Sequence, residues 1–285
     1  MALGALSRNK DSVKRFKNLI DEIIKVDGYQ IILDMSYFSF DQPDVYGKYW
    51  TTEKLLSFLE IKRLNSWDDE SNNKNIYYDL AKAVQTKFEE IIKEFIAKAI
   101  SETKIKNITI TGGCAMNSVS NGKLHKWFPS NNFYIPPYPD DSGIAIGAAI
   151  IGSEEIGDKI KKQDQKNYIY TGNNYQNEEI LKCINESKLK FIDKKNNWQN
   201  IADLISKGKL IGIFSGRSEF GQRALGNRSI VGDPRKSETK ILLNKAVKYR
   251  ESFRPFAPSV LKEYCDQIFD DYTDSYYMER VLHVK

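Results

Sequence analysis

The chain has 285 residues, of which 41% are hydrophobic and 12% aromatic, a composition that can build a packed core. Its 43 basic and 38 acidic residues are spread along the whole sequence, which argues against a nucleic-acid-binding protein. No run of eighteen apolar residues occurs, so we expect no membrane span. The three cysteines form no CxxC pair, which argues against a disulfide framework or a cysteine zinc site and predicts a reducing, cytoplasmic location.

The first half of the sequence alternates helical and strand patterns. Apolar residues recur at helical spacing over residues 11–26 and 76–100, which predicts two amphipathic helices. Residues 106–113 are a β-branched run that stops at a glycine pair, and we expect a helix to begin after it. Residues 132–152 repeat the order of strand, turn and small-residue helix. The alternation predicts an α/β fold.

A charged stretch at residues 153–167 offers few apolar anchors and predicts a domain boundary near residue 163. The second half then contains further short elements. We expect helices at 177–187 and 197–208, a buried strand at 209–216 and a helix from 237 to about 248.

Arginine is unevenly distributed. Six of the ten arginines lie between residues 217 and 254, and the stretch from residue 216 onward also contains Gly216, Gly221, Gly226 and Gly232. Lysine would supply charge equally well on a solvated surface, but it lacks the planar fork that binds phosphate or carboxylate through two bonds. Glycine permits close backbone approach, which suits an anion-binding loop. The stretch therefore predicts oxyanion recognition. A structural salt-bridge network or a subunit interface formed by Arg217, Glu219, Arg223 and Arg228 is the alternative.

Two strand-to-helix turns are further candidate sites. Free backbone N–H groups after Gly112 and Gly113 would favour an anion, although an ordinary β-to-α turn explains the glycine pair as well. Asn117 could reach the same ligand or simply bond the backbone. Asp141 directly precedes the helix expected from residue 142 onward. It could cap that helix, and Asp140 could serve equally.

Four segments of this sequence closely resemble the carbamoyltransferase family that makes nodulation factors and adds O-carbamoyl groups to antibiotics. They are TGGCAMN, PPYPDDSGIAIGAA, GRSEFGQRALGNRSIVGDPR and LNKAVKYRESFRPFAPSVL, in the family's order. The resemblance implies the second half of an actin-like ATPase (threonylcarbamoyltransferase-like) domain at 1–162. It also implies an α/β threonylcarbamoyl-AMP-synthase-like domain at 163–285.

The resemblance also implies a function and a set of site residues. The second domain would join carbamoyl phosphate to ATP, bound with Mg(II), and give carbamoyl-adenylate and pyrophosphate. A hydroxyl of a small molecule or sugar would then accept the carbamoyl group. By position in the motifs, phosphate and carbamoyl contacts would come from Arg223, Arg228, Lys248 and Arg254, and the loop would be supported by Arg217 and Glu219. Nucleotide would bind at Gly112, Gly113 and Asn117. Asp141 would be a ligand of Fe(II) or another divalent metal.

The sequence also departs from the family pattern. His125 and His283 are the two histidines, and neither belongs to the HxxxH motif that the family carries early in its first domain. Residues 1–7 resemble a segment from the interior of that domain, and the chain stops where the family's second domain continues. We therefore expect a fragment, from a disrupted gene or a split enzyme. A separately encoded N-terminal piece or a second copy would be its partner. A nucleotide-binding remnant without catalysis and a tRNA threonylcarbamoylation protein are the rival functions.

Overall fold

The computed structural model describes residues 1–40, 50–64, 74–158, 169–192 and 197–285. These residues form two compact units, which are described separately. Unit 1 contains residues 1–106 and 248–255, and unit 2 contains residues 107–247 and 256–285. The boundary expected near residue 163 lies outside the described residues. Across the described part of the chain, no helix is both long and apolar enough to cross a bilayer.

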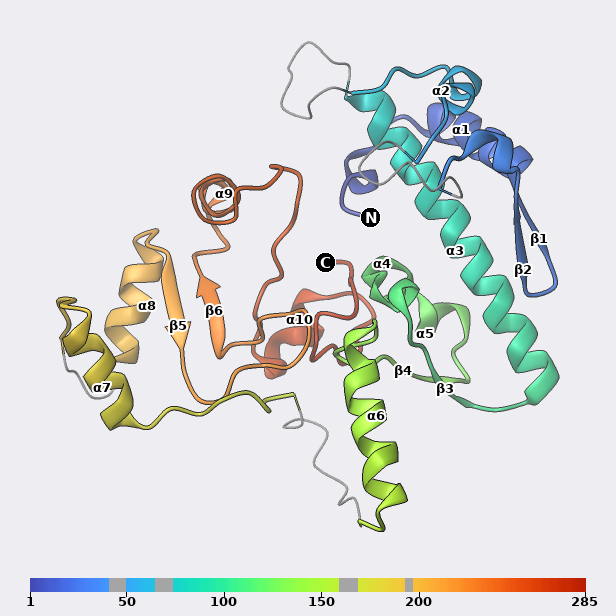
Figure 1. Cartoon of the computed structure of the whole chain (residues 1–285). Helices are drawn as coiled ribbons and strands as arrows, with labels where there is room; N and C mark the ends of the chain where they lie inside the picture. The colour runs from blue at the N-terminus through green and yellow to red at the C-terminus, as the bar shows by residue number, and fades with distance from the viewer. Residues whose placement is uncertain (41–49, 65–73, 159–168, 193–196) are drawn as a thin grey trace. The chain divides into compact units, whose positions relative to one another are not determined.

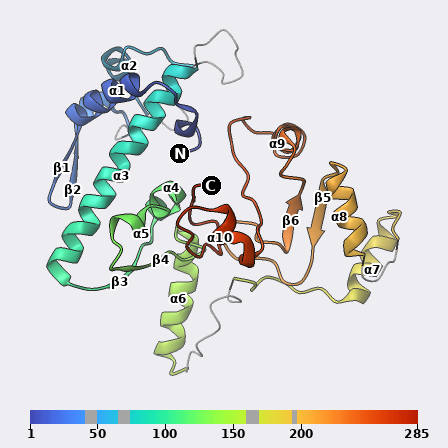
Figure 2. The ribbon, with the colours of Figure 1, turned by 180° about the vertical axis from the view of Figure 1, so that it is seen from behind.

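Unit 1 is built on two helices that pack side by side, α1 (Lys10–Ile23) and α3 (Asn75–Thr103) (Figures 1 and 2). Asn9 caps α1, because its side-chain oxygen accepts the N–H groups of Asp11 and Ser12. The core of the unit combines apolar residues from α1, α2 (Glu53–Leu59) and α3. Its buried members are Phe16, Ile20, Ile23, Leu55, Leu59 and Ala83.

The predicted helix over residues 11–26 ends earlier than expected. Residues 24–27 form β1 (Ile24–Asp27), which pairs antiparallel with β2 (Gln30–Leu33). Gly28 has a φ of +62° at the first position of the two-residue turn, where a type II′ hairpin requires glycine. Ile24 and Val26 are β-branched, and the hairpin partner outweighs the continuing helical pattern.

Unit 2 begins with a parallel pair of strands, β3 (Asn107–Thr109) and β4 (Asn132–Tyr134). A four-residue 3-10 helix (Gly113–Met116) and two short helices, α4 (Ser118–Asn121) and α5 (Leu124–Trp127), connect them. Helix α6 (Ser142–Glu155) follows β4 and contains no buried residue. The parallel strands and their helical connection agree with the predicted alternation.

The remainder of unit 2 carries the arginine loop, which we define as residues 215–228. Helices α7 (Asn177–Glu186) and α8 (Trp198–Ser206) precede β5 (Ile211–Phe214), which pairs antiparallel with β6 (Arg228–Val231) (Figure 1). The strand expected at 209–216 is present, but the expectation that it is buried is wrong. Phe214 is 60% exposed. In the two-stranded sheet of β5 and β6, the residues of β5 are alternately half-buried and exposed, and Phe214 is one of the exposed residues.

The chain ends in short elements. Helix α9 (Ser237–Leu242) continues as a π-helical turn (Leu243–Val247), close to the predicted end of this helix. Helix α10 (Cys265–Ile268) lies near the C-terminus. We define residues 279–281 as the C-terminal strap. Its Val281 N–H donates to the Ser118 carbonyl, and its Glu279 carbonyl accepts from Asn121 Nδ2 at 2.9 Å.

Candidate functional site

The glycine turn, residues 112–117, follows β3 directly. Gly112 has a φ of +86°, which favours glycine, and its N–H donates to the Pro139 carbonyl at 2.6 Å. A Cβ at Gly112 or Gly113 would meet nothing within 4 Å, so the space beside both residues is open. A helical segment begins here, as expected, but it consists of four-residue pieces interrupted at Asn117. The dipole of a long helix is therefore not available to an anion.

Asn117 bonds the backbone, as one of its two interpretations required. Its side-chain oxygen accepts the Ser120 N–H at 3.2 Å and caps α4. The C-terminal strap packs directly against this helix, and a Cβ added at Gly122 would lie 2.0 Å from the Val281 carbonyl oxygen. The helix that follows the glycine turn is thus held by residues from the end of the chain.

The aspartate turn at residues 140–142 precedes α6. Asp141 occupies the N-cap position, but its side chain makes no capping hydrogen bond. Asp140 instead accepts the Ser142 hydroxyl at 2.7 Å, and this bond lowers the pKa of Asp140 below its usual value. The interpretation of Asp141 as a side-chain cap is therefore wrong, because its backbone lies in the right-handed helical region and Asp140 bonds Ser142.

We expect Asp141→Asn to change the free energy of unfolding by less than about 0.5 kcal/mol, because no capping bond is lost. Thermal or urea unfolding measures this difference. The variant Asn9→Ala, which removes the cap of α1, is the control and should cost about 1 kcal/mol. A comparable loss in Asp141→Asn would show that the aspartate is structural.

The described residues do not make a metal centre around Asp141. No group of three His, Cys, Asp or Glu side chains able to hold a metal ion occurs among them. Both ring nitrogens of His125 are buried and find no hydrogen-bond partner in the described part of the chain. Burial lowers its pKa, which favours the neutral imidazole. Asp141 would therefore supply a single ligand, and one carboxylate is too few to hold such an ion by itself.

Glu219 organises the arginine loop from its centre. Its Oε1 accepts the backbone N–H groups of Leu225, Asn227 and Arg228 at 2.7, 2.8 and 3.4 Å. Burial opposes ionisation of this carboxyl, but the N–H donors outweigh burial and lower the pKa of Glu219. The carboxylate thus fixes the backbone between residues 219 and 228, as its predicted supporting role requires.

The contribution of Glu219 to stability should depend on pH. A lowered folded-state pKa means that its stabilisation is present above the unfolded pKa of about 4.3 and disappears as pH falls through the folded value. We expect Glu219→Gln to lose about 1 kcal/mol of unfolding free energy at pH 7 and much less near pH 3. Urea unfolding at both pH values measures this. An equal loss of unfolding free energy at both pH values would show that the loop is not stabilised by the ionised carboxylate of Glu219.

Arg217 and Arg228 both donate to backbone carbonyls. Arg217 Nη1 donates to the Gly172 carbonyl at 3.1 Å, and Arg228 donates to the carbonyls of Ser215 and Gly216 at 2.8 and 3.1 Å. Within the described ranges, neither arginine forms an ion pair with Glu219. The salt-bridge alternative is therefore wrong, although both arginines do stabilise the loop. Asp233, in contrast, does form an ion pair, since it binds Arg235 through two bonds at 2.8 and 2.9 Å.

Arg223 differs from these arginines. It is exposed, and its guanidinium has no partner among the described residues. Lys248 is likewise exposed and unpaired within them, whereas Arg254 binds Glu251 at 2.8 Å. The structure groups Arg223 and Arg228 in unit 2 and Lys248 and Arg254 in unit 1. It therefore describes the four predicted phosphate contacts as two separate pairs.

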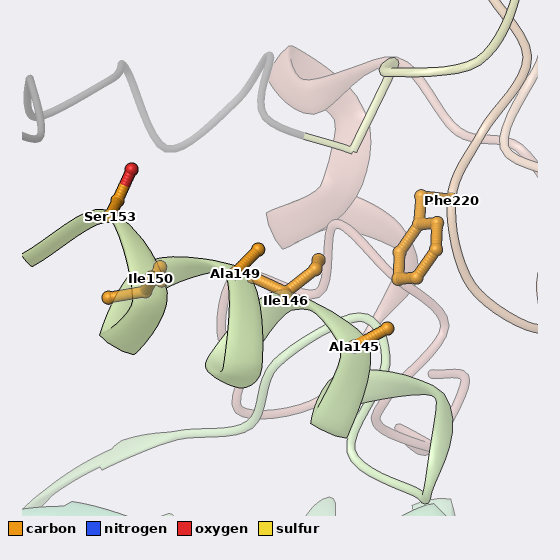
Figure 3. A pocket seen from close by; sticks show the side chains of 6 residues that line it. All are labelled: Ala145, Ile146, Ala149, Ile150, Ser153 and Phe220. Carbon is orange, nitrogen blue, oxygen red and sulfur yellow. The ribbon is translucent and has the colours of Figure 1, made fainter. Parts of the chain in front are cut away.

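Within unit 2, the arginine loop packs against both strand-to-helix turns. Gln222 Nε2 lies 3.3 Å from the Met116 sulfur, and the rings of Phe220 and Tyr138 meet edge to face at 5.3 Å. Phe220 also faces α6 across an apolar pocket of about 360 Å³ (Figure 3). That pocket is lined by Ala145, Ile146, Ala149, Ile150, Ser153 and Phe220. Three motifs that are far apart in the sequence thus meet in one unit.

Sequence reasoning missed a segment that supports the loop, residues 169–172. Phe220 N–H donates to the Ile169 carbonyl, and Gly172 N–H donates to the Ser218 carbonyl. The Tyr170 hydroxyl donates to the Leu225 carbonyl at 3.0 Å. The short run of aromatic and β-branched residues in YIYTG was the available sequence signal, but a run this short does not reveal its partner. In the structure Ile169 is buried and Tyr170 is half-buried.

Comparison with known families accounts for this combination of motifs. The family model described as the carbamoyltransferase N-terminus matches residues 3–150, and the one described as the carbamoyltransferase C-terminus matches residues 202–285. The chain belongs to the carbamoyltransferase family. The predicted resemblance is confirmed, and the mixed helix and strand fold agrees with it.

Individual relatives are similar over most of this chain. Nodulation protein NolNO of Sinorhizobium fredii is 30% identical over 94% of the chain, which covers 36% of the relative. Nodulation protein NolO of Bradyrhizobium diazoefficiens is 34% identical over 67% of the chain, covering 35% of the relative. An uncharacterized protein of Synechocystis is 33% identical over 94% of the chain, covering 43% of the relative. The chain thus spans less than half the length of these relatives.

Proposed function

We propose that this chain is part of an ATP-dependent O-carbamoyltransferase that moves a carbamoyl group from carbamoyl phosphate, through carbamoyl-adenylate, to a hydroxyl of a small molecule or sugar. Family membership supports the carbamoyl chemistry. The observation that carries the proposal is Arg223, an exposed guanidinium without a described partner on a loop whose backbone Glu219 fixes. A planar cation on an ordered loop suits phosphate groups.

The proposed reaction proceeds in three balanced steps. Water hydrolyses carbamoyl phosphate and leaves carbamate and phosphate. A carbamate oxygen attacks the α-phosphorus of ATP, the bond to the β-phosphate oxygen breaks, and pyrophosphate leaves. The acceptor hydroxyl then attacks the carbamoyl carbon, loses its proton and displaces AMP. In the second step charge spreads over phosphoryl oxygens, which preorganised cations stabilise.

In this proposal each predicted residue has a role. Arg223 and Arg228 of unit 2 and Lys248 and Arg254 of unit 1 are the proposed phosphate and carbamoyl contacts. The open space at Gly112 and Gly113 leaves room for nucleotide, and Mg(II) accompanies ATP. The proposed domains are 1–162, with the actin-like fold, and 163–285, with the threonylcarbamoyl-AMP-synthase-like fold.

The experiment that tests the proposal is carbamoyl-phosphate-dependent exchange of labelled pyrophosphate into ATP by the purified chain. Exchange requires the first two steps alone, so it does not depend on the acceptor or on a metal at Asp141. Exchange that needs both ATP and carbamoyl phosphate would support the proposal. Binding of ATP without exchange would instead favour the nucleotide-binding remnant.

A split enzyme is the second candidate, favoured by one observation: Asp141 has no companion ligands among the described residues. The exposed isoleucines of α6, such as Ile144 and Ile151, would suit a protein partner, either a separately encoded piece or a second copy. Mass spectrometry of acceptor carbamoylation, with and without such a partner added in trans, tests this. The geometry of the described residues does not favour tRNA threonylcarbamoylation.

A further inference from the structure

Two large aromatic rings lie exposed beside the arginine loop. Phe214 ends β5 immediately before the loop and is 60% exposed, and Tyr175 is 46% exposed. Their ring centroids are 5.9 Å apart, with the ring planes tilted by 39°. Two aromatic side chains that contact each other yet keep much of their surface in water form a surface on which a flat apolar ligand can pack.

Both rings are attached to ordered parts of unit 2. The Arg228 guanidinium lies 3.7 Å from the centroid of the Phe214 ring, and carbonyls of Ser215 and Gly216 hold it there. Tyr175 follows the supporting segment 169–172, which hydrogen-bonds the arginine loop through Gly172. The rings therefore do not need to be ordered at the moment a ligand binds, which reduces the entropic cost of binding.

A stacking surface beside a cationic loop matches the two chemical halves of a nucleotide. Bases stack on aromatic faces, and guanidinium groups add to the attraction. Arg223, on the same loop, supplies for phosphate a cation that no described residue pairs with. We propose that Tyr175 and Phe214 form a stacking platform for the adenine base of the nucleotide whose phosphates Arg223 binds. This inference rests on the proposed function, because it assigns the base-binding half of the same site.

The platform predicts a specific difference between two probes, ATP and inorganic tripolyphosphate, which lacks the base. We expect the single variant Tyr175→Ala to weaken ATP binding about tenfold or more. The double variant, which combines Tyr175→Ala with Phe214→Ala, should do the same. Tripolyphosphate binding should stay unchanged in both. Isothermal titration calorimetry of each probe against each variant measures this. Tyr264→Ala, which removes a ring that is 48% exposed elsewhere in unit 2, is the matched control and should change neither.

The outcomes separate the platform from the proposed function. Arg223→Ala should weaken both probes. If Arg223→Ala changes neither while Tyr175→Ala still weakens ATP, the phosphate assignment fails and the platform stands. Unchanged ATP affinity in Tyr175→Ala and in the double variant would overturn the platform. So would an equal loss for ATP and tripolyphosphate in Tyr175→Ala, since that would show damage to the loop.

Discussion

Replacing Arg223 with alanine is expected to lower carbamoyl-phosphate-dependent ATP–pyrophosphate exchange at least a hundredfold. Loss of one preorganised charge that stabilises a phosphoryl transition state typically costs this much. Arg223 is the arginine of its loop whose guanidinium is not occupied by described partners, so its removal leaves the Glu219 network in place. Labelled pyrophosphate incorporation into ATP measures the effect. Lys248→Ala should reduce the same exchange.

Two further variants control this experiment. Arg223→Lys keeps the charge but loses the two-pronged fork, so we expect it to restore little activity. Arg8→Ala removes another exposed arginine, outside the predicted site, and should leave exchange unchanged. Unchanged exchange in Arg223→Ala would remove Arg223 from the reaction and, with it, the observation that supports the proposed function.

Replacing Gly122 with alanine is expected to destabilise unit 2 by about 3 kcal/mol or more. The added Cβ would lie 2.0 Å from the Val281 carbonyl oxygen, so the C-terminal strap must move away from α4. That movement would break the hydrogen bonds from Val281 to Ser118 and from Asn121 to Glu279. The midpoint of urea unfolding, followed by circular dichroism, measures the loss.

A second glycine provides the matched control. Gly147 lies within α6, and a Cβ added there would meet nothing within 4 Å. Gly147→Ala should therefore raise the unfolding free energy by about 0.5–1 kcal/mol, since alanine loses less conformational entropy in a helix. If Gly122→Ala were as stable as Gly147→Ala, the strap would not pack where the structure places it.

Local patterns predicted the elements whose stability is mostly local. The apolar spacing over residues 76–100 predicts helix α3. The glycine pair Gly112 and Gly113 marks the end of strand β3, which precedes the pair. The arginine loop also stood out, because arginine and glycine together are unusual on a surface rich in lysine. Each of these signals lies within a single stretch of sequence.

Partners from distant segments could not be predicted in the same way. The spacing of the loop does not say that Arg228 directs its fork at carbonyl oxygens while Arg223 has no described partner, because that depends on where the backbone turns. Asp141 shows the same limit: its position is that of a cap, yet its conformation leaves Asp140 to bond Ser142. Residues 169–172 escaped notice because their partners lie about fifty residues away.

The C-terminal strap has a consequence for synthesis of the protein on the ribosome. The side-chain amide of Asn121 donates to the carbonyls of Ala115 and Glu279. Glu279 is synthesised 158 residues after Asn121, so the second of these bonds cannot form before then. Contacts between such distant residues form late, because a long loop has to close first. Helix α4 is therefore translated early but acquires its contacts with the strap only after residue 281 has emerged from the exit tunnel.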